Sequence, residues 1–422
     1  MSEVIEQRAL TVVAPIREGA EGELDRLLRG LRLGPVDGVV LDLRKVKSLH
    51  FGRFVILPAM ADRGVLPKLA FESNFDGSLD EHLDELYAKN ARALDRIFSH
   101  CEGYAGGSGF MDFARNRSVP SAAYYRAHAG LGVKQIQSDA KVRDAIEAWL
   151  DGEQRAGRLE GLSAREIRRG LLSHLATLRI DGDPARLGPV ERGLPRYPRN
   201  YLDFGLALVS RPLRIVRALL GARRHERREA RDWPEQLKKL VQDRDPLLDA
   251  IHRSEDRVEQ NGLTHLVPIK PGPYRHATLR TALWVVSLLA RFIAVTGTLG
   301  GLDTIHFARW ALLDDDRLLF FSNYDGSWEA YLGDFIDKVS PWLTMIWTST
   351  QWFPPTRWLF GGGAADERSF KRWTRTWQLE NQLWYSAYPR LSVGAVLGNA
   401  RIREAAVGDL DDPALGEWLE KL

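Results

Sequence analysis

Cysteine is almost absent from this chain. The 422 residues include a single one, Cys101, which excludes an intramolecular disulfide and is typical of a reducing compartment. No basic segment followed by an apolar run stands near Met1, so we expect no secretory signal. We therefore predict a cytoplasmic protein in which Cys101 is a structural thiol.

A surplus of charge and long apolar runs are lacking as well. The 59 basic and 56 acidic residues leave a net charge of +3, and arginine does not alternate with aromatic residues in a stripe. A nucleic-acid partner is therefore not predicted. The apolar run at 201–210 has about ten residues before Arg211, too few to cross a bilayer. Apolar residues still make up 44% of the chain, enough for a large core.

Common site motifs are also missing. The sequence has no Gly-x-Gly-x-x-Gly after an expected strand, no P-loop, no Gly-x-Ser-x-Gly elbow, no Cys-x-x-Cys and no His-Glu-x-x-His. The ten histidines show no metal-ligand spacing, so we predict no metal site. No motif therefore names a reaction.

The most informative feature that is present is an internal repeat. Residues 49–54, LHFGRF, correspond to residues 305–310, IHFARW; residues 71–78, FESNFDGS, correspond to 320–327, FFSNYDGS. Flanking matches such as Tyr125 with Tyr385 extend the repeat outward. A duplicated module therefore spans most of the chain.

The pattern within one module predicts its fold. A β-branched run at 9–15 precedes helically spaced leucines at 24–31, two further strands are expected at 49–57 and 68–74, and a helix is expected to begin near Ser78 with a capping box. A last strand is expected before Tyr125 or around Val133. This order predicts an α+β fold of the ferredoxin-like type.

Each such sheet has one face without helices, which must be buried. We expect the two modules to pack these faces together as a pseudo-symmetric dimeric α/β barrel, with a binding cavity between the sheets. The predicted division is module one at 1–150, a mostly helical insertion at 151–261, and a Trp-rich module two at 262–422.

The repeated blocks supply the candidate site residues. His50 and His306 are either hydrogen-bonded core residues or cofactor ligands. Strand alternation predicts that each histidine and the neighbouring arginine, Arg53 or Arg309, point to opposite faces unless a bulge intervenes. Each buried arginine should meet a carboxylate, and we expect these to be Asp76 and Asp325.

The motif Ser-Asn-x-Asp-Gly-Ser, which includes Asn323, has two interpretations. In the structural one, its side chains form a turn and cap a helix. In the functional one, Asp76 and Asp325 act as acids or bases with arginine as the charge partner. Eight of the 13 tryptophans lie between Trp328 and Trp384, so we expect module two to be the working half and Asp325 to matter more than Asp76.

The segment 201–220 could bind a membrane surface. Its second half alternates Arg211, Arg214 and Arg217 with leucine and isoleucine, a pattern that suits anionic headgroups. The alternative is an ordinary solvated helix packed on the modules.

The Ser-Asn-x-Asp-Gly-Ser blocks resemble the Gly-x-x-Asp-Gly motif of dye-decolourising peroxidases, haem enzymes built from two ferredoxin-like modules. This resemblance implies haem as the cofactor, with Asp76 or Asp325 on its distal side and His50, His306 and Asn323 as the residues expected near it. The chain departs from the motif at Ser73 and Ser322, where the first glycine belongs, and the proximal histidine is not identified. Module two also resembles a largely uncharacterised bacterial family that carries the Ile-His-Phe-Ala-Arg-Trp and Ser-Asn-Tyr-Asp-Gly-Ser-Trp-Glu signature.

Two functions follow as expectations. The first is a redox enzyme of the dimeric α/β-barrel type, either haem-dependent and peroxidase-like or cofactor-free. The second is a non-catalytic protein that binds a small apolar molecule, a membrane surface or a protein partner.

Overall fold

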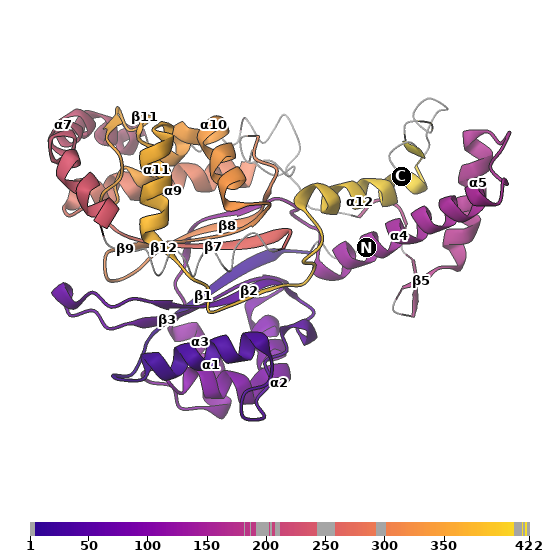
Figure 1. Ribbon diagram of the computed structural model, residues 1–422, viewed down its shortest axis with the longest axis horizontal. Helices are drawn as coiled ribbons and strands as arrows, with labels where there is room; N and C mark the ends of the chain where they lie inside the picture. Colours follow the sequence, from indigo (N-terminus) through magenta and orange to yellow (C-terminus); the bar gives the residue numbers. More distant parts are fainter. Residues whose placement is uncertain are drawn as a thin grey trace.

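The computed structural model describes residues 5–180, 182–185, 187–190, 202, 205–206, 212–242, 258–292, 301–408, 416 and 418–419. Within these residues the chain is an α+β protein with ten helices and two main antiparallel sheets (Figure 1). Two short hairpins accompany them, β5 (Arg179–Ile180) with β6 (Asp183–Pro184) and β10 (Thr356–Arg357) with β11 (Gly361–Gly362).

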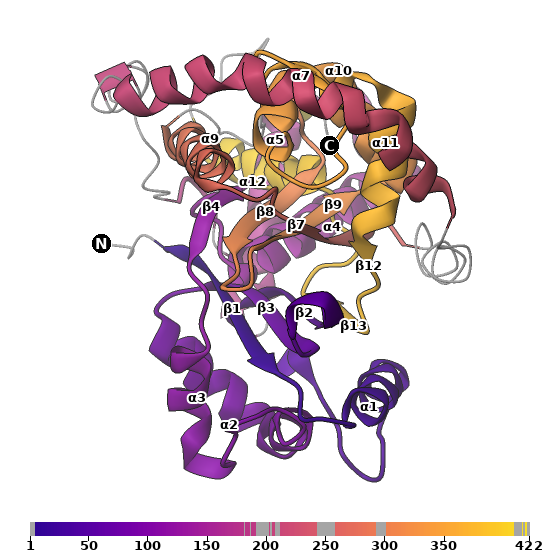
Figure 2. The same cartoon turned by 90° about the vertical axis from the view of Figure 1, so that its left-hand side faces the viewer.

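The first sheet has the strand order β1 (Gln7–Pro15), β3 (Lys68–Asp76), β2 (Leu49–Leu57), β13 (Leu383–Ser386). Helices α1 (Glu21–Leu33), α2 (Leu79–Phe98) and α3 (Phe110–Asn116) cover its outer face (Figure 2). They bury the leucines of α1 and α2 against β1, β2 and β3 in one apolar cluster. The strands and helices expected at 9–15, 24–31, 49–57, 68–74 and from Ser78 are therefore confirmed.

The second sheet has the order β12 (Gln378–Leu379), β7 (Gln260–Pro268), β9 (Arg317–Asp325), β8 (Ile305–Leu312), β4 (Ser121–Arg126). Helices α9 (Pro273–Phe292), α10 (Trp328–Trp347) and α11 (Glu367–Trp377) lie on its outer side, and α7 (Pro212–Gln242) runs across them (Figure 2).

One strand of each sheet comes from the other half of the chain. Strand β4 follows α3 in sequence but pairs with β8, whereas β13, near the end of the chain, pairs with β2. Tyr125 pairs with Ala308 and Tyr385 pairs with Gly52, so the two crossing strands occupy corresponding positions in the repeat. The halves are thus tied together by backbone hydrogen bonds as well as by side chains.

The inner faces of the sheets pack against each other. Val13, Val55 and Ala70 of the first sheet share a buried cluster with Leu266 and Phe321 of the second. The expectation of a closed barrel is wrong for the described residues, where the sheets remain separate. The physical reason is that the strands at two of the edges, β12 with two residues and β13 with four, are too short to carry a continuous ladder from one sheet to the other.

A pair of helices extends from one end of the two sheets (Figure 1). Helix α4 (Val133–Arg155) packs on α12 (Val393–Ala406), and α5 (Ala164–Thr177) follows α4. Arg403 of α12 donates to Asp139 of α4 at 2.7 Å, and both side chains are buried. The last strand, expected before Tyr125 or around Val133, is therefore β4 at the first of these positions, and Val133 begins a helix. Arg211 and most of 201–210 lie outside the described residues.

Candidate functional site

A β-bulge directs both histidines into the interface between the sheets. The register of β2 with β3 shifts between Leu49 and Phe51, and that of β8 with β9 shifts between Ile305 and Phe307. A bulge adds one residue to a strand and so changes which side chains share a face. As a result His50 contacts Phe307, with ring centroids 5.2 Å apart. The bulge named as the exception to strand alternation therefore occurs, and both His50 and Arg53 face the other sheet.

Each histidine pairs with the aspartate of its own repeat. His50 Nε2 lies 2.8 Å from Asp76 Oδ1, and His306 Nε2 lies 2.8 Å from Asp325 Oδ1. Both imidazoles are fully buried, whereas the side chains of Asp76 and Asp325 are 16% and 10% exposed. The pairs are therefore buried at the imidazole and reach the surface at the carboxylate.

The second oxygen of each aspartate binds the first turn of a helix. Asp76 Oδ2 accepts from the backbone N–H of Val133, which begins α4, and Asp325 Oδ2 accepts from that of Val393, which begins α12, both at 2.7 Å. The positive end of a helix favours a negative charge at this place. Gly132 permits the approach, because a Cβ there would lie 2.9 Å from Asp76 Oδ2. The aspartates thus link the sheets to α4 and α12, the two helices that project from one end of the sheets.

A glutamine side chain lies beside the histidine of each His–Asp pair. Gln7 begins β1 opposite Asp76, and Gln260 occupies the corresponding position of β7 opposite Asp325. Gln7 Nε2 donates to the carbonyl of Leu131 at 2.8 Å, and Gln260 Oε1 accepts from the Ser386 hydroxyl at 2.7 Å. Their side-chain nitrogens lie 3.4 Å from His50 Nε2 and 3.2 Å from His306 Nε2.

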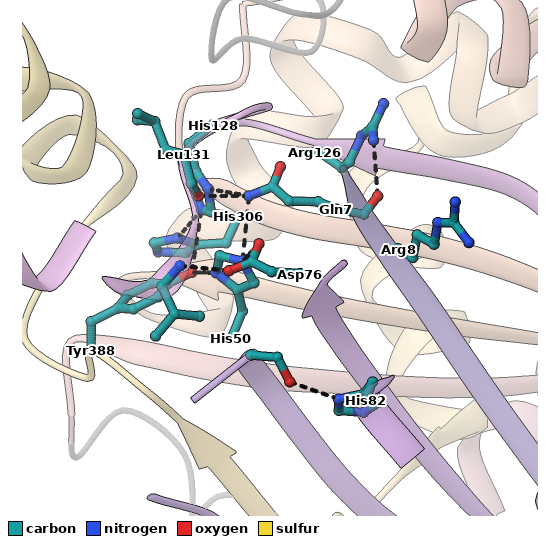
Figure 3. A network of polar contacts seen from close by, with 12 residues as sticks. Gln7, Arg8, His50, Asp76, His82, Arg126, His128, Leu131, His306 and Tyr388 are labelled. Carbon is teal, nitrogen blue, oxygen red and sulfur yellow. Dashed lines mark hydrogen bonds and ion pairs between the residues drawn. The ribbon is translucent and has the colours of Figure 1, made fainter. Parts of the chain in front are cut away.

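His128 and Tyr388 join the two pairs into one network, and Figure 3 shows its part from Asp76 to His306. The Tyr388 hydroxyl lies 2.8 Å from His50 Nδ1 and 3.5 Å from His128 Nε2, which in turn lies 3.3 Å from His306 Nδ1. Both residues are buried. Burial, followed by the nearby charge of Asp76, raises the pKa of Tyr388 well above its ordinary value. We call the chain Asp76–His50–Tyr388–His128–His306–Asp325 the polar relay.

Sequence reasoning singled out four of the six relay residues and missed His128 and Tyr388. His128 follows β4 and Tyr388 follows β13, the two strands that cross between the halves. The two residues are 260 positions apart, the same spacing as between Tyr125 and Tyr385. The alignment of the repeats therefore matches these two positions. Because one is histidine and the other tyrosine, the residue types did not indicate that the match matters.

Neither arginine bonds the aspartate expected for it. Arg53 Nε donates to Glu72 at 3.0 Å, and its other nitrogens donate to the carbonyls of Leu263 and Ser322 and to Asn323. Arg309 is equally buried, yet none of its side-chain nitrogens has a hydrogen-bond partner among the described residues. Pairing of these arginines with Asp76 and Asp325 is therefore a wrong expectation, because the aspartates bind histidine.

The difference between the arginines has a cause in the sequence. The carboxylate of Glu72 in the first repeat is replaced by Phe321 in the second. The Arg53 guanidinium lies over the Phe321 ring, 5.1 Å from its centroid. Burial lowers the pKa of Arg309 to about 10, although Glu72 partly offsets this effect. Asn323, expected near a cofactor, accepts hydrogen bonds from Arg53 and from Trp384.

Most of the tryptophans fill the core between the second sheet and its helices. Trp347 and Trp373 pack edge-on to His265 of β7, and the void that they line measures about 20 Å³. Asp325 is held by His306 and Val393, just as Asp76 is held by His50 and Val133. The tryptophans therefore give no reason to rank Asp325 above Asp76.

The residues expected to hold haem do not fit it. His50 and His306 use both ring nitrogens in hydrogen bonds, so iron could bind neither without breaking one. Among the described residues, no group of three or more His, Cys, Asp or Glu side chains has a metal-binding arrangement.

Comparison of the chain with protein-family models, with curated proteins and with solved structures finds no match. In the described part of the chain, no helix combines the length and apolarity needed to cross a membrane.

Proposed function

We propose that the protein is an enzyme of proton-transfer chemistry and that the polar relay carries its protons. The observation that supports this proposal is the continuity of the chain: six groups able to exchange protons, at successive separations of 2.8, 2.8, 3.5, 3.3 and 2.8 Å, connect two partly exposed carboxylates. Imidazole and carboxylate are the groups that most often act as general acids and bases.

The hydrogen bonds suggest one proton arrangement. With neutral imidazoles, His50 and His306 each donate from Nε2 to an aspartate, so their Nδ1 atoms accept from Tyr388 O–H and from His128 Nε2–H. When His306 holds a second proton at Nδ1, His128 takes its Nδ1–H tautomer, so that His128 Nε2 accepts that proton. The proton then passes from His128 Nε2 to the Tyr388 oxygen as that hydroxyl gives its own proton to His50 Nδ1. The net result is one imidazolium moved from Asp325 to Asp76.

The relay also bears on the architecture. We propose that the two halves are duplicated ferredoxin-like modules related by a pseudo-twofold axis that passes between His128 and Tyr388. The repeated registers support this, since Gln7 pairs with Asp76 as Gln260 pairs with Asp325. The bulges between Leu49 and Phe51 and between Ile305 and Phe307 support it as well.

The test is 15N nuclear magnetic resonance of histidine-labelled protein at a fixed pH, where the ring nitrogen shifts report which imidazole holds the proton. In Asp76→Asn, His50 loses the charge that stabilises its imidazolium, so the shared proton should favour His306 and move its ring nitrogen shifts toward those of an imidazolium. Tyr388→Phe breaks the relay, so the same Asp76→Asn change should leave His306 unmoved in that background.

The matched control is Glu85→Gln, which removes a carboxylate bonded to Ser48 and outside the relay. It should not move the ring nitrogen shifts of His306. Shifts of His306 that do not change in Asp76→Asn, or that change equally with and without the Tyr388 hydroxyl, would contradict the relay.

A second candidate function, binding of an apolar molecule or a membrane surface, is favoured by the first half of α7. Leu213, Val216 and Leu220 are 69%, 47% and 78% exposed beside Arg214 and Arg217. Exposed apolar residues clustered with cations are typical of surfaces that meet lipids.

A further inference from the structure

Two adjoining pockets lie where α7 crosses α9, on the outer side of the second sheet. The first, of about 250 Å³, is lined almost only by apolar side chains, among them Leu219, Val285, Trp342 and Phe360. The second, of about 480 Å³, contains Arg214, Arg217, Arg280 and His276. Ala218, Thr278 and Thr281 line both, so the pockets meet at these residues.

The described residues that line the second pocket include no acidic side chain. Its cations come from two elements, with Arg214 and Arg217 on α7 and Arg280 on α9. The first turn of α9, with Pro273 and His276, also lines the pocket, and a helix N-terminus adds positive potential there. This end of the site is therefore suited to an anion.

The position of α7 over these pockets is fixed by partly buried contacts with α9. Tyr274 of α9 stacks on His225 at 4.2 Å and donates from its hydroxyl to the Ala218 carbonyl at 2.6 Å. The fit is close, because a Cβ on Gly221 would lie 2.2 Å from the Tyr274 ring. The apolar pocket is thus part of the folded structure and not a gap beside a loose helix.

The loop that closes the apolar pocket is fixed in the same way. Glu226 of α7 is 2% exposed and accepts from the backbone N–H groups of Trp358 and Leu359 at 3.0 and 2.8 Å. These bonds place Leu359 and Phe360 along the pocket wall.

We propose that this site binds a monomeric amphiphilic anion, with its alkyl chain in the apolar pocket and its acidic head group among Arg214, Arg217 and Arg280. The inference rests on the binding function proposed above and specifies its ligand class. An apolar pocket that opens into a basic one matches a molecule with a hydrocarbon chain and a single negative end. The membrane alternative uses the opposite, outward face of α7, at Leu213, Val216 and Leu220.

The experiment is calorimetric titration of the full chain with dodecanoate below its micelle concentration. We expect one binding site per protein molecule. Acetate should not bind, because it lacks the alkyl tail, and dodecyltrimethylammonium should not bind, because it carries the opposite charge. Arg217→Glu and Arg280→Glu should each weaken dodecanoate binding by about tenfold or more. Thr281→Phe, which fills the junction of the pockets, should abolish it.

The matched control is Arg231→Glu, an exposed position on α7 outside the lining, which should bind dodecanoate as the unmodified chain does. Thermal unfolding of every variant separates lost binding from lost folding. If folded Arg217→Glu and Thr281→Phe proteins bind dodecanoate normally, the proposed site is wrong. If dodecanoate does not bind but phosphatidylglycerol vesicles do, the ligand is a membrane surface; the monomer proposal then fails while the binding function stands. Failure to bind either probe would overturn both.

Discussion

The two interfacial arginines occupy unequal environments despite their equivalent places in the repeat. Arg53 is paired with Glu72 and bonded to backbone carbonyls of the opposite sheet, whereas Arg309 has no hydrogen-bond partner among the described residues. A buried charge without hydrogen bonds is costly, and replacing it by an apolar side chain of similar size is often neutral or stabilising.

We therefore expect Arg309→Met to leave the free energy of unfolding unchanged or to raise it, by up to about 4 kcal/mol. Arg53→Met should lower it by about 3–5 kcal/mol, because Glu72 would remain buried without its partner. Urea unfolding of both variants measures the difference. Equal losses in the two proteins would mean that Arg309 contributes as much to stability as its counterpart.

At the residue scale the sequence predicted the chemical groups of the site better than their pairing. The histidines and aspartates were singled out by repetition, but the expected arginine partners followed only from the cost of burying an unpaired charge, which does not say which carboxylate is the partner. The bulge beside His50 changes strand alternation, and nothing in the six residues LHFGRF predicts where the extra residue is accommodated. Side-chain pairing at a bulge depends on the neighbouring strand, which a local pattern does not contain.

Among the elements, α2 shows how local and tertiary signals combine. Its capping box between Ser78 and Glu81 was predicted and is present. Its buried face includes His82, which stacks on Phe75 at 4.0 Å and lies 3.0 Å from both Ser48 Oγ and Ser73 Oγ. Burial lowers the pKa of His82 to about 3.

This shift predicts an acid sensitivity of the helix-to-sheet contact. Above pH 6.5 the imidazole is neutral in both the folded and unfolded protein and the contact contributes fully. Between pH 6.5 and about 3 the unfolded chain binds a proton that folded His82 does not, so stability falls as pH falls, by at most about 1.4 kcal/mol per pH unit.

The variant His82→Tyr should remove that slope. Tyrosine occupies the corresponding position of the second repeat, where Tyr331 donates to Ser322 at 2.8 Å. Between pH 6 and 4.5, we expect the unfolding free energy of the variant to fall less steeply with pH than that of the unmodified protein. The difference in slope should correspond to about one proton fewer taken up on unfolding. Glu85 bonds the same Ser48 hydroxyl as His82, and Glu85→Gln tests whether this carboxylate contributes to the slope. Identical slopes in the His82→Tyr and unmodified proteins would show that His82 does not titrate as argued.

The elements that were predicted correctly carry their signal locally. The spaced leucines of α1 and the β-branched run of β1 are examples. The last strand was expected at either Tyr125 or Val133, because a short apolar stretch fits a strand or a helix equally well; β4 lies at the first position and Val133 is helical. Its helical state follows from Asp76, which lies 57 positions earlier and caps α4.

At the scale of the whole molecule, the exchange of β4 and β13 between the sheets was beyond sequence reasoning. Either strand could in principle complete its own module, and the residue pattern of an edge strand does not specify its partner. The repeat predicted that two sheets pack together, which the inner cluster around Val55 and Phe321 confirms. It did not predict that each sheet would be completed by the other half.

This exchange predicts that neither half folds alone. A chain cut at residue 250, outside the described residues, leaves β2 without β13 in one fragment and β8 without β4 in the other. Each fragment would also expose an inner sheet face and lose half of the polar relay. We expect fragments 1–250 and 251–422 to show no cooperative thermal unfolding separately and to regain one shared transition when they are refolded together. As the matched control, the intact chain carrying a protease site at residue 250 and cut after folding should stay associated through gel filtration. A single fragment that unfolds cooperatively at the midpoint of the intact chain would mean that the crossing strands are dispensable, and the two halves would then be independent domains.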